Sequence, residues 1–236
     1  MRGPYLSVVI PVFNEEESLD ILYGELAAVL DRLPGGSEII FVDDGSRDES
    51  LAALRALELK DQRVRTIAFE RNCGQSAALD AGFRAARGEI TATLDADLQN
   101  DPAELPKLLA YLDRADVVGG VRVVRRDSGL KRLSSRIANA VRNWATGADV
   151  ADVGCSLRVM RTSYLRKIKL YRGMHRFLPT LLAMEGARLF EVDVSHRARR
   201  FGLSKYGVVD RLCVGLVDLL AVCWMQRRSL RQGTRL

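Results

Sequence analysis

The sequence predicts an α/β fold in which a mostly parallel β-sheet is flanked by helices. Two observations support this prediction. Short apolar runs rich in β-branched residues alternate with helical stretches through the first hundred residues, and each run ends in a polar turn. The chain contains no repeat or low-complexity linker, and its 236 residues suit one α/β domain with a full core.

The strands are predicted from apolar runs that close on turn residues. They are expected at residues 5–12, 38–42, 64–69, 90–94, 116–121, 157–160 and 189–194. Helices are expected near 16–32, 47–60, 75–87, 130–146, 162–169 and 175–185. Ser46 and Asp48 are predicted to cap the helix near 47–60, and Asp101 to begin another with Pro102 in its first turn.

The C-terminal segment is a separate feature, because residues 212–225 are apolar except for Asp218 and are followed by four arginines. Spanning a bilayer takes about 20 apolar residues, so this shorter run predicts an amphipathic helix on a membrane or against a membrane partner. A C-terminal core helix is the alternative. We therefore expect a main domain at 1–206, and a membrane-proximal helix and basic tail at 207–236.

The net charge of +6 is unevenly distributed. Residues 122–142 carry seven basic side chains against one acidic one, and residues 197–236 carry nine against two. Such clusters contact phosphates of lipids, nucleotides or nucleic acids, or are simply solvated. An aromatic content of 6% without a stacking pattern argues against a nucleic-acid partner. The lack of G-x-G-x-x-G after the first strand argues against a dinucleotide-dependent oxidoreductase.

Polar residues follow three of the predicted strands, at Asn14-Glu15, Asp43-Asp44 and Asp95-Ala96-Asp97. The carboxyl ends of parallel strands meet at one edge, where α/β sheets bind ligands, so we expect these turns to converge. If the fourth strand keeps its pleat, Asp95 and Asp97 point to the same side. Carboxylate oxygens with open positions suit Mg²⁺ or Mn²⁺ bridging a diphosphate.

Four runs in order, Ser7–Glu15, Val42–Ser46, Asn72–Gly82 and Asp95–Gln99, resemble the motifs of family 2 glycosyltransferases. Downstream, Gly120–Arg122, Asp152–Arg158 and Arg199–Tyr206 resemble the branch that makes polyprenyl-phosphate sugars, such as dolichol-phosphate mannose synthase and undecaprenyl-phosphate aminoarabinose transferase. The resemblance covers residues 5–225. It implies a GT-A type, Rossmann-like fold and an inverting enzyme that uses a nucleotide-diphosphate sugar and Mg²⁺ or Mn²⁺.

The resemblance also implies roles for particular residues. Asp95, Asp97 and Gln99 would hold the metal, and the residues of catalysis would be Asp95, Asp97, Arg122 and Lys205. The phosphates would be clamped by Arg122, Arg199 and Lys205, with Lys131, Arg132 and Ser135 as further candidates for the acceptor phosphate. The nucleotide would be held by Pro11, Phe13, Glu15, Val42, Asp44 and the backbone of Ala96.

The acceptor is expected to be a polyprenyl phosphate. A phosphate monoester is already anionic at neutral pH and needs cations that hold it in line with the anomeric carbon, whereas a sugar hydroxyl needs a carboxylate base. The excess of Arg and Lys at 122–142 and 197–205 fits the phosphate. The alternative is a family 2 enzyme that glycosylates a saccharide or protein hydroxyl.

The cysteines and the N-terminus bear on location. Cys73, Cys155, Cys213 and Cys223 form no CxxC pair, which predicts no zinc site and reduced, mostly buried thiols. No apolar leader follows Met1, so we expect a cytoplasmic protein, peripheral on the cytosolic face of the inner membrane. The two histidines, His175 and His196, are interpreted as structural.

Overall fold

The fold is built on one seven-stranded sheet with the strand order β3-β2-β1-β4-β6-β5-β7. The computed structural model describes residues 3–123, 142–147, 150–198, 200–201 and 208–229, and the side chains of α8 from Gly215 onward. Only β6 runs antiparallel to its neighbours among the described strands. The strands are β1 (Leu6–Val12), β2 (Ser37–Asp43), β3 (Val64–Ala68), β4 (Ile90–Thr93), β5 (Val117–Arg122), β6 (Arg158–Arg161) and β7 (Leu189–Val194).

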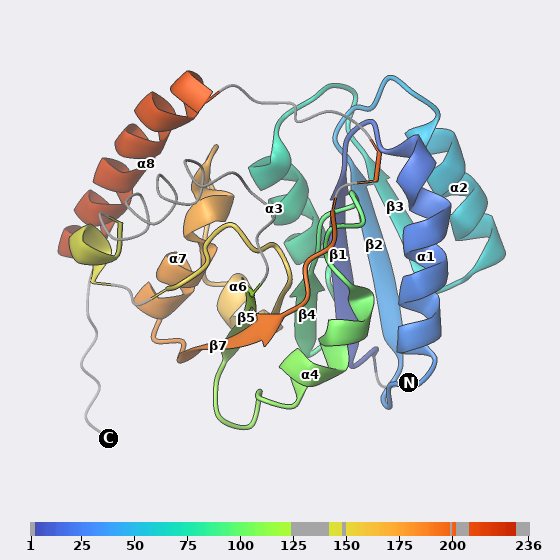
Figure 1. The fold of residues 1–236 in the computed structure, drawn as a ribbon, viewed down its shortest axis with the longest axis horizontal. Coiled ribbons are helices and arrows are strands. Elements are labelled where there is room, and N and C mark those ends of the chain that lie inside the picture. Colours follow the sequence, from blue (N-terminus) through green and yellow to red (C-terminus); the bar gives the residue numbers. More distant parts are fainter. Residues whose placement is uncertain (1–2, 124–141, 148–149, 199, 202–207, 230–236) are drawn as a thin grey trace.

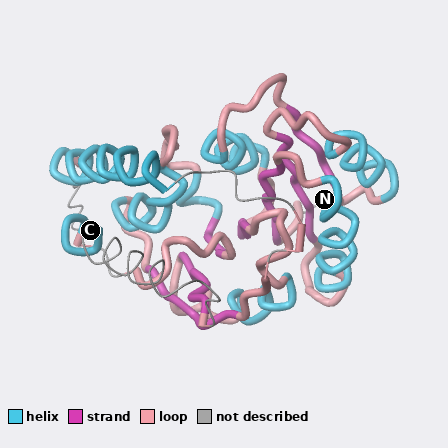
Figure 2. Tube along the Cα trace, turned by 45° about the horizontal axis from the view of Figure 1, so that its top comes forward, coloured by secondary structure: helices cyan, strands magenta, loops and turns pink. Residues whose placement is uncertain are grey.

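The helices follow the strands as the alternating pattern predicts. They are α1 (Glu16–Leu30), α2 (Ser50–Lys60), α3 (Gln75–Ala85), the 3₁₀ turn η1 (Pro102–Glu104), α4 (Leu105–Leu109), α6 (Thr162–Leu165), the 3₁₀ turn η2 (Met174–Phe177), α7 (Leu178–Met184) and α8 (Val208–Arg228). All seven predicted strands are confirmed to within a residue or two. In Figures 1 and 2, α8 lies at the opposite end of the molecule from α1 and α2.

Three helix predictions need correction. The helix expected at 47–60 begins at Ser50. Ser46 accepts from the backbone N–H of Asn14 instead of capping this helix, whereas Asp48 Oδ1 accepts from the N–H of Ser50, its first residue. The helix expected at 162–169 ends at Leu165, and the one at 175–185 divides into η2 and α7. Of the helix predicted at 130–146, residues 142–146 are helical and the rest lies outside the described residues. The predicted start at Asp101 is confirmed, since its side chain accepts from the N–H of Ala103.

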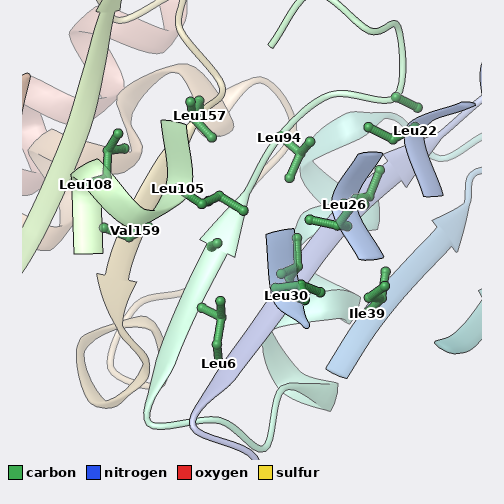
Figure 3. Close-up of a cluster of buried hydrophobic side chains, with 14 of the residues drawn as sticks. Leu6, Leu22, Leu26, Leu30, Ile39, Leu94, Leu105, Leu108, Leu157 and Val159 are labelled. Carbon is green, nitrogen blue, oxygen red and sulfur yellow. The ribbon is translucent and has the colours of Figure 1, made fainter. Parts of the chain in front are cut away.

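The core occupies both faces of the sheet because side chains alternate along each strand. Val8 and Ile10 of β1 pack with α1, α2 and α4 on one face, and Val9 packs with α3, α6 and α7 on the other. Figure 3 shows the first cluster, in which Leu22, Leu26 and Leu30 recur at every turn of α1. Full burial of such a side chain stabilises the fold by about 1.5–3 kcal/mol.

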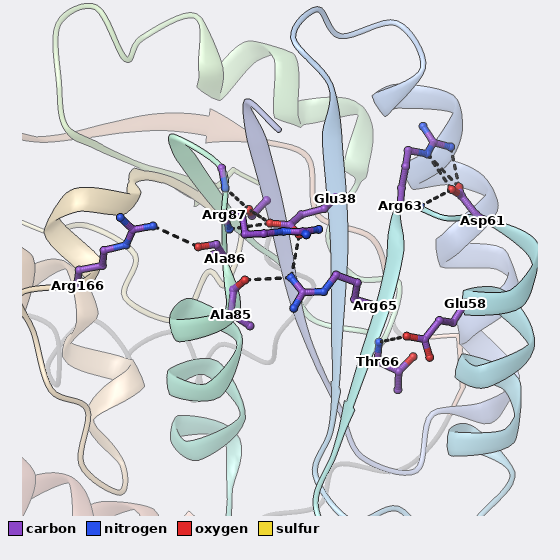
Figure 4. A network of polar contacts seen from close by, with 12 residues as sticks. Glu38, Glu58, Asp61, Arg63, Arg65, Thr66, Ala85, Ala86, Arg87 and Arg166 are labelled. Carbon is purple, nitrogen blue, oxygen red and sulfur yellow. Dashed lines mark hydrogen bonds and ion pairs between the residues drawn. The ribbon is translucent and has the colours of Figure 1, made fainter. Parts of the chain in front are cut away.

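The amino ends of the strands are closed by a polar network around Glu38. Its carboxylate, 3% exposed, accepts hydrogen bonds from Ser7 Oγ at 2.7 Å and from the backbone and side chain of Arg87. Arg65 adds a further contact at 3.0 Å and also donates to the carbonyl of Ala85 (Figure 4). This network ties β1, β2 and β3 to the link between α3 and β4, and it leaves the carboxyl ends of the strands as the place for a site.

From Gly215 onward, where its side chains are described, helix α8 packs on the rest of the protein through one face. Leu219 and Val222 are buried in a small cluster with Met174, Phe177 and Leu181 of η2 and α7. The predicted C-terminal helix is therefore confirmed, and it docks on the protein's own core. Among the residues with known placement, no helix is long and apolar enough to cross a membrane. The predicted domain boundary at 206 falls within 202–207, outside the described residues.

Candidate functional site

The loops after β1 and β2 are bonded to each other at the carboxyl edge of the sheet, along the upper edge in Figure 1. The N–H of Asn14 donates to Ser46 Oγ at 2.9 Å, and Asn14 Oδ1 accepts from the N–H of Arg47 at 2.8 Å. The N–H of Glu15 donates to Ser50 Oγ at 2.9 Å. These bonds join Asn14-Glu15 to the turn after Asp43-Asp44, as the sequence predicts.

The Asp95-Ala96-Asp97 sequence lies in a turn rather than on a strand. Strand β4 ends at Thr93, so the expectation that the strand pleat orients both carboxylates is wrong. The turn is shaped instead by Leu98, whose φ is +62°, and by the N–H of Gln99, which donates to Asp97 Oδ1 at 3.1 Å. Asp97 is buried and Asp95 half-buried. Both carboxylates therefore sit at the carboxyl end of β4, directly after the strand.

The loops after β1 and β4 each contain a residue with a strained backbone conformation. Asn14 after β1 and Leu98 after β4 are the non-glycine residues with positive φ in the part of the chain that the structure describes. Asn adopts this region with little cost, but a bulky Leu does so only where surrounding contacts impose it. Such strained positions cluster at functional sites. The observation supports placing the site at these loops.

Asp44 holds the loop that follows β3. Its carboxylate accepts from Asn72 Nδ2 at 2.9 Å, from the N–H of Cys73 at 2.7 Å and from the N–H of Gly74. Burial raises the pKa of Asp44 against the opposing effect of these bonds. The direct nucleotide contact that the sequence predicts for Asp44 stays a prediction, and the observed bonds show it positioning the loop at 72–74.

Asp43, the neighbour of Asp44, has a different environment. Its Oδ2 accepts from the N–H of Ser46 at 3.2 Å, while its Oδ1 is buried without a hydrogen-bond partner. A buried carboxylate oxygen without a donor is unfavourable, and such an atom in a native structure calls for an explanation. Asp43 therefore offers an acceptor at the end of β2, beside the loop that Asp44 holds.

Arg122, at the end of β5, is held by Asp152. Its Nε and Nη2 donate to the two oxygens of Asp152 at 2.7 and 2.9 Å, in a bidentate pair whose acid is 1% exposed. Glu191 of β7 in turn accepts from the N–H groups of Ala151 and Asp152. The sequence motif Asp152–Arg158 contains this partner, but nothing in the sequence alone pairs it with Arg122. The predicted phosphate contact of Arg122 stays a prediction.

The remaining predicted residues fall into two groups. Pro11, Phe13 and Glu15 are half-buried, whereas Val42 and Ala96 are buried, and the nucleotide contacts predicted for these five residues stay predictions. Lys131, Arg132, Ser135, Arg199 and Lys205 lie outside the described residues. The basic segment at 197–205 nevertheless begins at the site, because the N–H of Arg197 donates to the carbonyl of Gln99 at 2.9 Å.

The comparison with protein families decides the class of this site. The model described as Glycosyl transferase family 2 matches residues 7–169, which is more than half of the chain. The chain belongs to glycosyltransferase family 2. The four ordered motifs predicted from the sequence lie inside this match, and the family makes the chain a glycosyltransferase by class.

Curated relatives of this family 2 chain have informative names. It is 39% identical over 234 residues to dodecaprenyl-phosphate galacturonate synthase of Rhizobium johnstonii, covering 97% of this chain and 69% of that protein. It is 40% identical over 221 residues to undecaprenyl-phosphate 4-deoxy-4-formamido-L-arabinose transferase of Edwardsiella ictaluri, covering 93% and 67%. The chain thus spans about two thirds of the length of these relatives.

Solved structures confirm the fold. Glucosyl-3-phosphoglycerate synthase of Mycobacterium tuberculosis, crystallised with Mn²⁺ and UDP-glucose, matches with a TM-score of 0.70 at 20% identity, covering 99% of this chain and 83% of that one. A further structure of that enzyme was crystallised with Mg²⁺ and UDP, and it matches with a TM-score of 0.68 at 19% identity over 99% of this chain and 83% of that one. At this identity the likeness establishes the GT-A type architecture, as the sequence predicts.

The donor atoms of the family 2 site fit a hard divalent cation. Asp95 and Asp97 supply carboxylate oxygens, the ligand type that Mg²⁺ and Mn²⁺ prefer. No group of three or more His, Cys, Asp or Glu side chains in the described ranges is placed to hold a metal. The metal contacts predicted for Asp95, Asp97 and Gln99 stay predictions, and Mg²⁺ commonly takes its other ligands from phosphate substrates and water.

Two further expectations concern the thiols and histidines. Cys155 is buried as predicted, but Cys73 is exposed in the loop held by Asp44. His175 is half-buried, and its Nδ1 lies 2.8 Å from Ser76 Oγ. Burial, with Arg176 and Arg158 nearby, lowers the pKa of His175 to about 3, so its ring is neutral at physiological pH. The structural role predicted for it is consistent with this neutral, hydrogen-bonded state.

Proposed function

We propose that this protein transfers a sugar from a nucleotide-diphosphate sugar to a polyprenyl phosphate, with inversion at the anomeric carbon and with Mg²⁺ or Mn²⁺. The observation that carries the proposal is the Asp95–Asp97 turn at the carboxyl end of β4, in a chain at 39–40% identity to two named polyprenyl-phosphate sugar transferases. The two carboxylates can bind a divalent cation, and the cation in turn binds the diphosphate of the sugar donor. The relatives supply the class of acceptor.

On the donor side, Asp95 and Asp97 hold the cation, with Gln99 next to them. The cation, when bound, neutralises the negative charge that grows on the departing diphosphate. Asp43 Oδ1, buried without a donor, is proposed to accept from a base N–H or a ribose hydroxyl. Pro11 near the end of β1 and Phe13 in the loop after it are proposed to frame the base. The loop at 72–74, fixed by Asp44, closes this side of the site.

On the acceptor side, a phosphate acceptor requires positively charged side chains rather than a general base. A phosphate monoester is ionised at neutral pH, so no side chain has to remove a proton before it attacks. Positive groups hold it opposite the leaving diphosphate, and attack from that side inverts the configuration. Arg122 is anchored at the end of β5 for this purpose by Asp152. Arg199 and Lys205 are proposed to complete the clamp, with Lys131, Arg132 and Ser135.

The outer face of α8 supports attachment to the cytosolic face of the membrane. Leu216, Val217, Leu220 and Trp224 are 58–65% exposed and recur along the face opposite the buried Leu219 and Val222. Arg227 and Arg228 follow in the last turn. An apolar stripe with a Trp and terminal arginines suits the boundary between anionic headgroups and acyl chains. Residues 207–236 are thus proposed as the membrane-proximal segment.

The decisive test of the function is a transfer assay. The full chain is incubated with undecaprenyl phosphate, Mn²⁺ and a panel of radiolabelled UDP- and GDP-sugars, and label is counted in a butanol-extractable, mild-acid-labile lipid. We expect lipid-linked label with at least one donor. Label appearing only in added oligosaccharide or protein would refute the lipid acceptor and favour a hydroxyl-glycosylating enzyme of family 2.

Attachment is tested separately by sedimentation with vesicles. Binding to vesicles that contain phosphatidylglycerol, but weakly to phosphatidylcholine alone, is expected for the wild-type chain, and Leu220→Ser with Trp224→Ser should abolish it. Unchanged sedimentation of this double variant would rule out the stripe as the lipid-binding surface. Exposed Leu59→Ser in α2, at the other end of the molecule, serves as the matched control.

A further inference from the structure

The first residue of α3 contacts the Asp95–Asp97 turn. Gln75 Nε2 donates a hydrogen bond to Asp95 Oδ1 at 2.9 Å, between residues that are 20 positions apart in the sequence. No motif argument assigns Gln75 a role, although it lies in the run from Asn72 to Gly82. Gln75 could therefore either stabilise the start of α3 or orient the Asp95 carboxylate in the site.

The position of Gln75 is determined from both of its neighbours. On one side Asp44 binds the N–H groups of Cys73 and Gly74, and Gly74 turns the chain into α3 with a φ of +92°. On the other side Ser76 Oγ lies 2.8 Å from His175 Nδ1 and accepts from the N–H of His175 at 3.3 Å. Ser76 is only 5% exposed. The backbone at Gln75 is thus held on both sides, and its amide reaches Asp95 from this held position.

The chemical type of this donor is suited to a cation site. A carboxylate turns about its terminal bond unless one oxygen is fixed, and a metal ligand that turns binds less tightly because the ordering must happen on binding. An Arg or Lys in this position would fix Asp95 but would also repel a divalent ion. An amide N–H fixes the carboxylate without bringing a competing positive charge.

We infer that Gln75 is a positioning residue, which orients the Asp95 carboxylate for the divalent cation of the sugar donor. The inference rests on the proposed function, because it needs a metal at Asp95. Gln75 touches neither donor nor acceptor in this account and acts only through Asp95. Groups in this relation to a metal ligand typically change metal affinity 10–100-fold when they are removed.

The experiment compares Gln75→Met with Gln62→Met in the full chain. Methionine keeps the length and the helix-forming tendency of glutamine but has no donor, and Gln62 is an exposed glutamine in the turn between α2 and β3. Binding of Mn²⁺ is measured by electron paramagnetic resonance at saturating UDP, and thermal unfolding is measured without metal. We expect about a 10–100-fold weaker Mn²⁺ affinity for Gln75→Met, little change in its metal-free unfolding temperature, and wild-type values for Gln62→Met.

The outcomes separate a positioning role from a structural one. Wild-type Mn²⁺ affinity in Gln75→Met, whether or not its unfolding temperature falls, overturns the inference. Gln75→Asn keeps the amide on a shorter side chain, so an intermediate affinity supports it and provides the measurement if the methionine variant fails to fold. If the wild-type chain itself binds no Mn²⁺ with UDP, the metal-dependent proposed function fails, which is a different result from an unaffected Gln75 variant.

Discussion

Replacing Asp152 by alanine removes the partner of Arg122, and its consequence can be worked out from the structure. Asp152 is 1% exposed at its side chain and accepts from Arg122 Nε and Nη2 at 2.7 and 2.9 Å and from the N–H of Gly154 at 3.1 Å. The alanine variant removes the acid that holds the guanidinium and the acceptor of two backbone N–H groups, those of Arg122 and Gly154. Both the stability of the fold and the placement of Arg122 are therefore affected.

The size of the effect depends on how much water reaches Arg122. Breaking a buried ion pair by removing one member costs about 3–5 kcal/mol. Arg122 is 20% exposed and partly rehydrates, so we expect about 3 kcal/mol, the lower end of that range. For a chain of this length 1 kcal/mol corresponds to about 2–4 °C in unfolding temperature, which gives a decrease of about 6–12 °C. Asp152→Asn keeps the shape and one acceptor oxygen, so its decrease should be about half as large.

The assay is thermal unfolding by circular dichroism at pH 7, with sugar transfer to undecaprenyl phosphate measured well below the unfolding temperature. Asp193→Ala is the matched control, because Asp193 is exposed on β7 and should change stability by less than about 0.5 kcal/mol. We expect reduced transfer in both Asp152 variants while they are fully folded. An unfolding temperature within 2 °C of the wild type for Asp152→Ala would refute this reasoning.

Three further predictions address metal binding, the stability of the fold at acidic pH and the packing of α8. Asp97→Ala should abolish transfer by removing a metal ligand, while the metal-free chain unfolds within a few degrees of the wild type; measurable turnover with Mn²⁺ would contradict the assignment. Burial disfavours the charge of Glu38, but hydrogen bonds from Ser7 and Arg87 outweigh burial and lower the pKa of Glu38 in the folded protein. The ionised carboxylate therefore contributes its full stabilisation above the pKa of the unfolded chain, about 4.3, and this stabilisation is lost as pH falls through the lower folded pKa. The difference in unfolding free energy between wild type and Glu38→Gln should therefore shrink from pH 6 to pH 3, and a constant difference would oppose it. Gly173 has a φ of +83°, and a Cβ there would lie 2.3 Å from Asp218 Oδ2 of α8. Gly173→Ala should therefore lower the free energy of unfolding by about 1–3 kcal/mol and speed proteolysis near α8. Unchanged proteolysis would show that α8 shifts to accommodate the methyl group without detaching.

The strands and the meeting of their loops could be predicted because they follow from local pattern. Apolar runs closed by polar residues gave every strand of the sheet, and parallel topology then required the turns after β1, β2 and β4 to share one edge. The shape of the turn after β4 could not be predicted. Leu98 carries a positive φ that nothing in a leucine suggests. Strand β4 already ends at Thr93, before the two carboxylates to which the pleat argument applied.

Side-chain partners far apart in the chain were also beyond the sequence. Arg122 and Asp152 are 30 positions apart and Gln75 and Asp95 are 20 apart, and each pair meets only because separate elements bring them together. The C-terminal segment shows the same limit in another form. Apolar residues of this segment fall on all sides of the helix. The sequence alone therefore does not predict that Leu219 and Val222 face the core while Leu220 and Trp224 face outward.

The packing of α8 bears on how an enzyme with a lipid acceptor would be oriented. Leu219 and Val222 of α8 pack against η2, whose His175 pairs with Ser76 at the start of α3. The preceding residue, Gln75, bonds to Asp95. The helix proposed to contact lipid and the turn proposed to bind the metal are thus joined through two packed elements. If α8 lies on the membrane, this packing fixes the height of the donor site above the headgroups, so an acceptor phosphate can meet the donor while its polyprenyl chain stays in the bilayer.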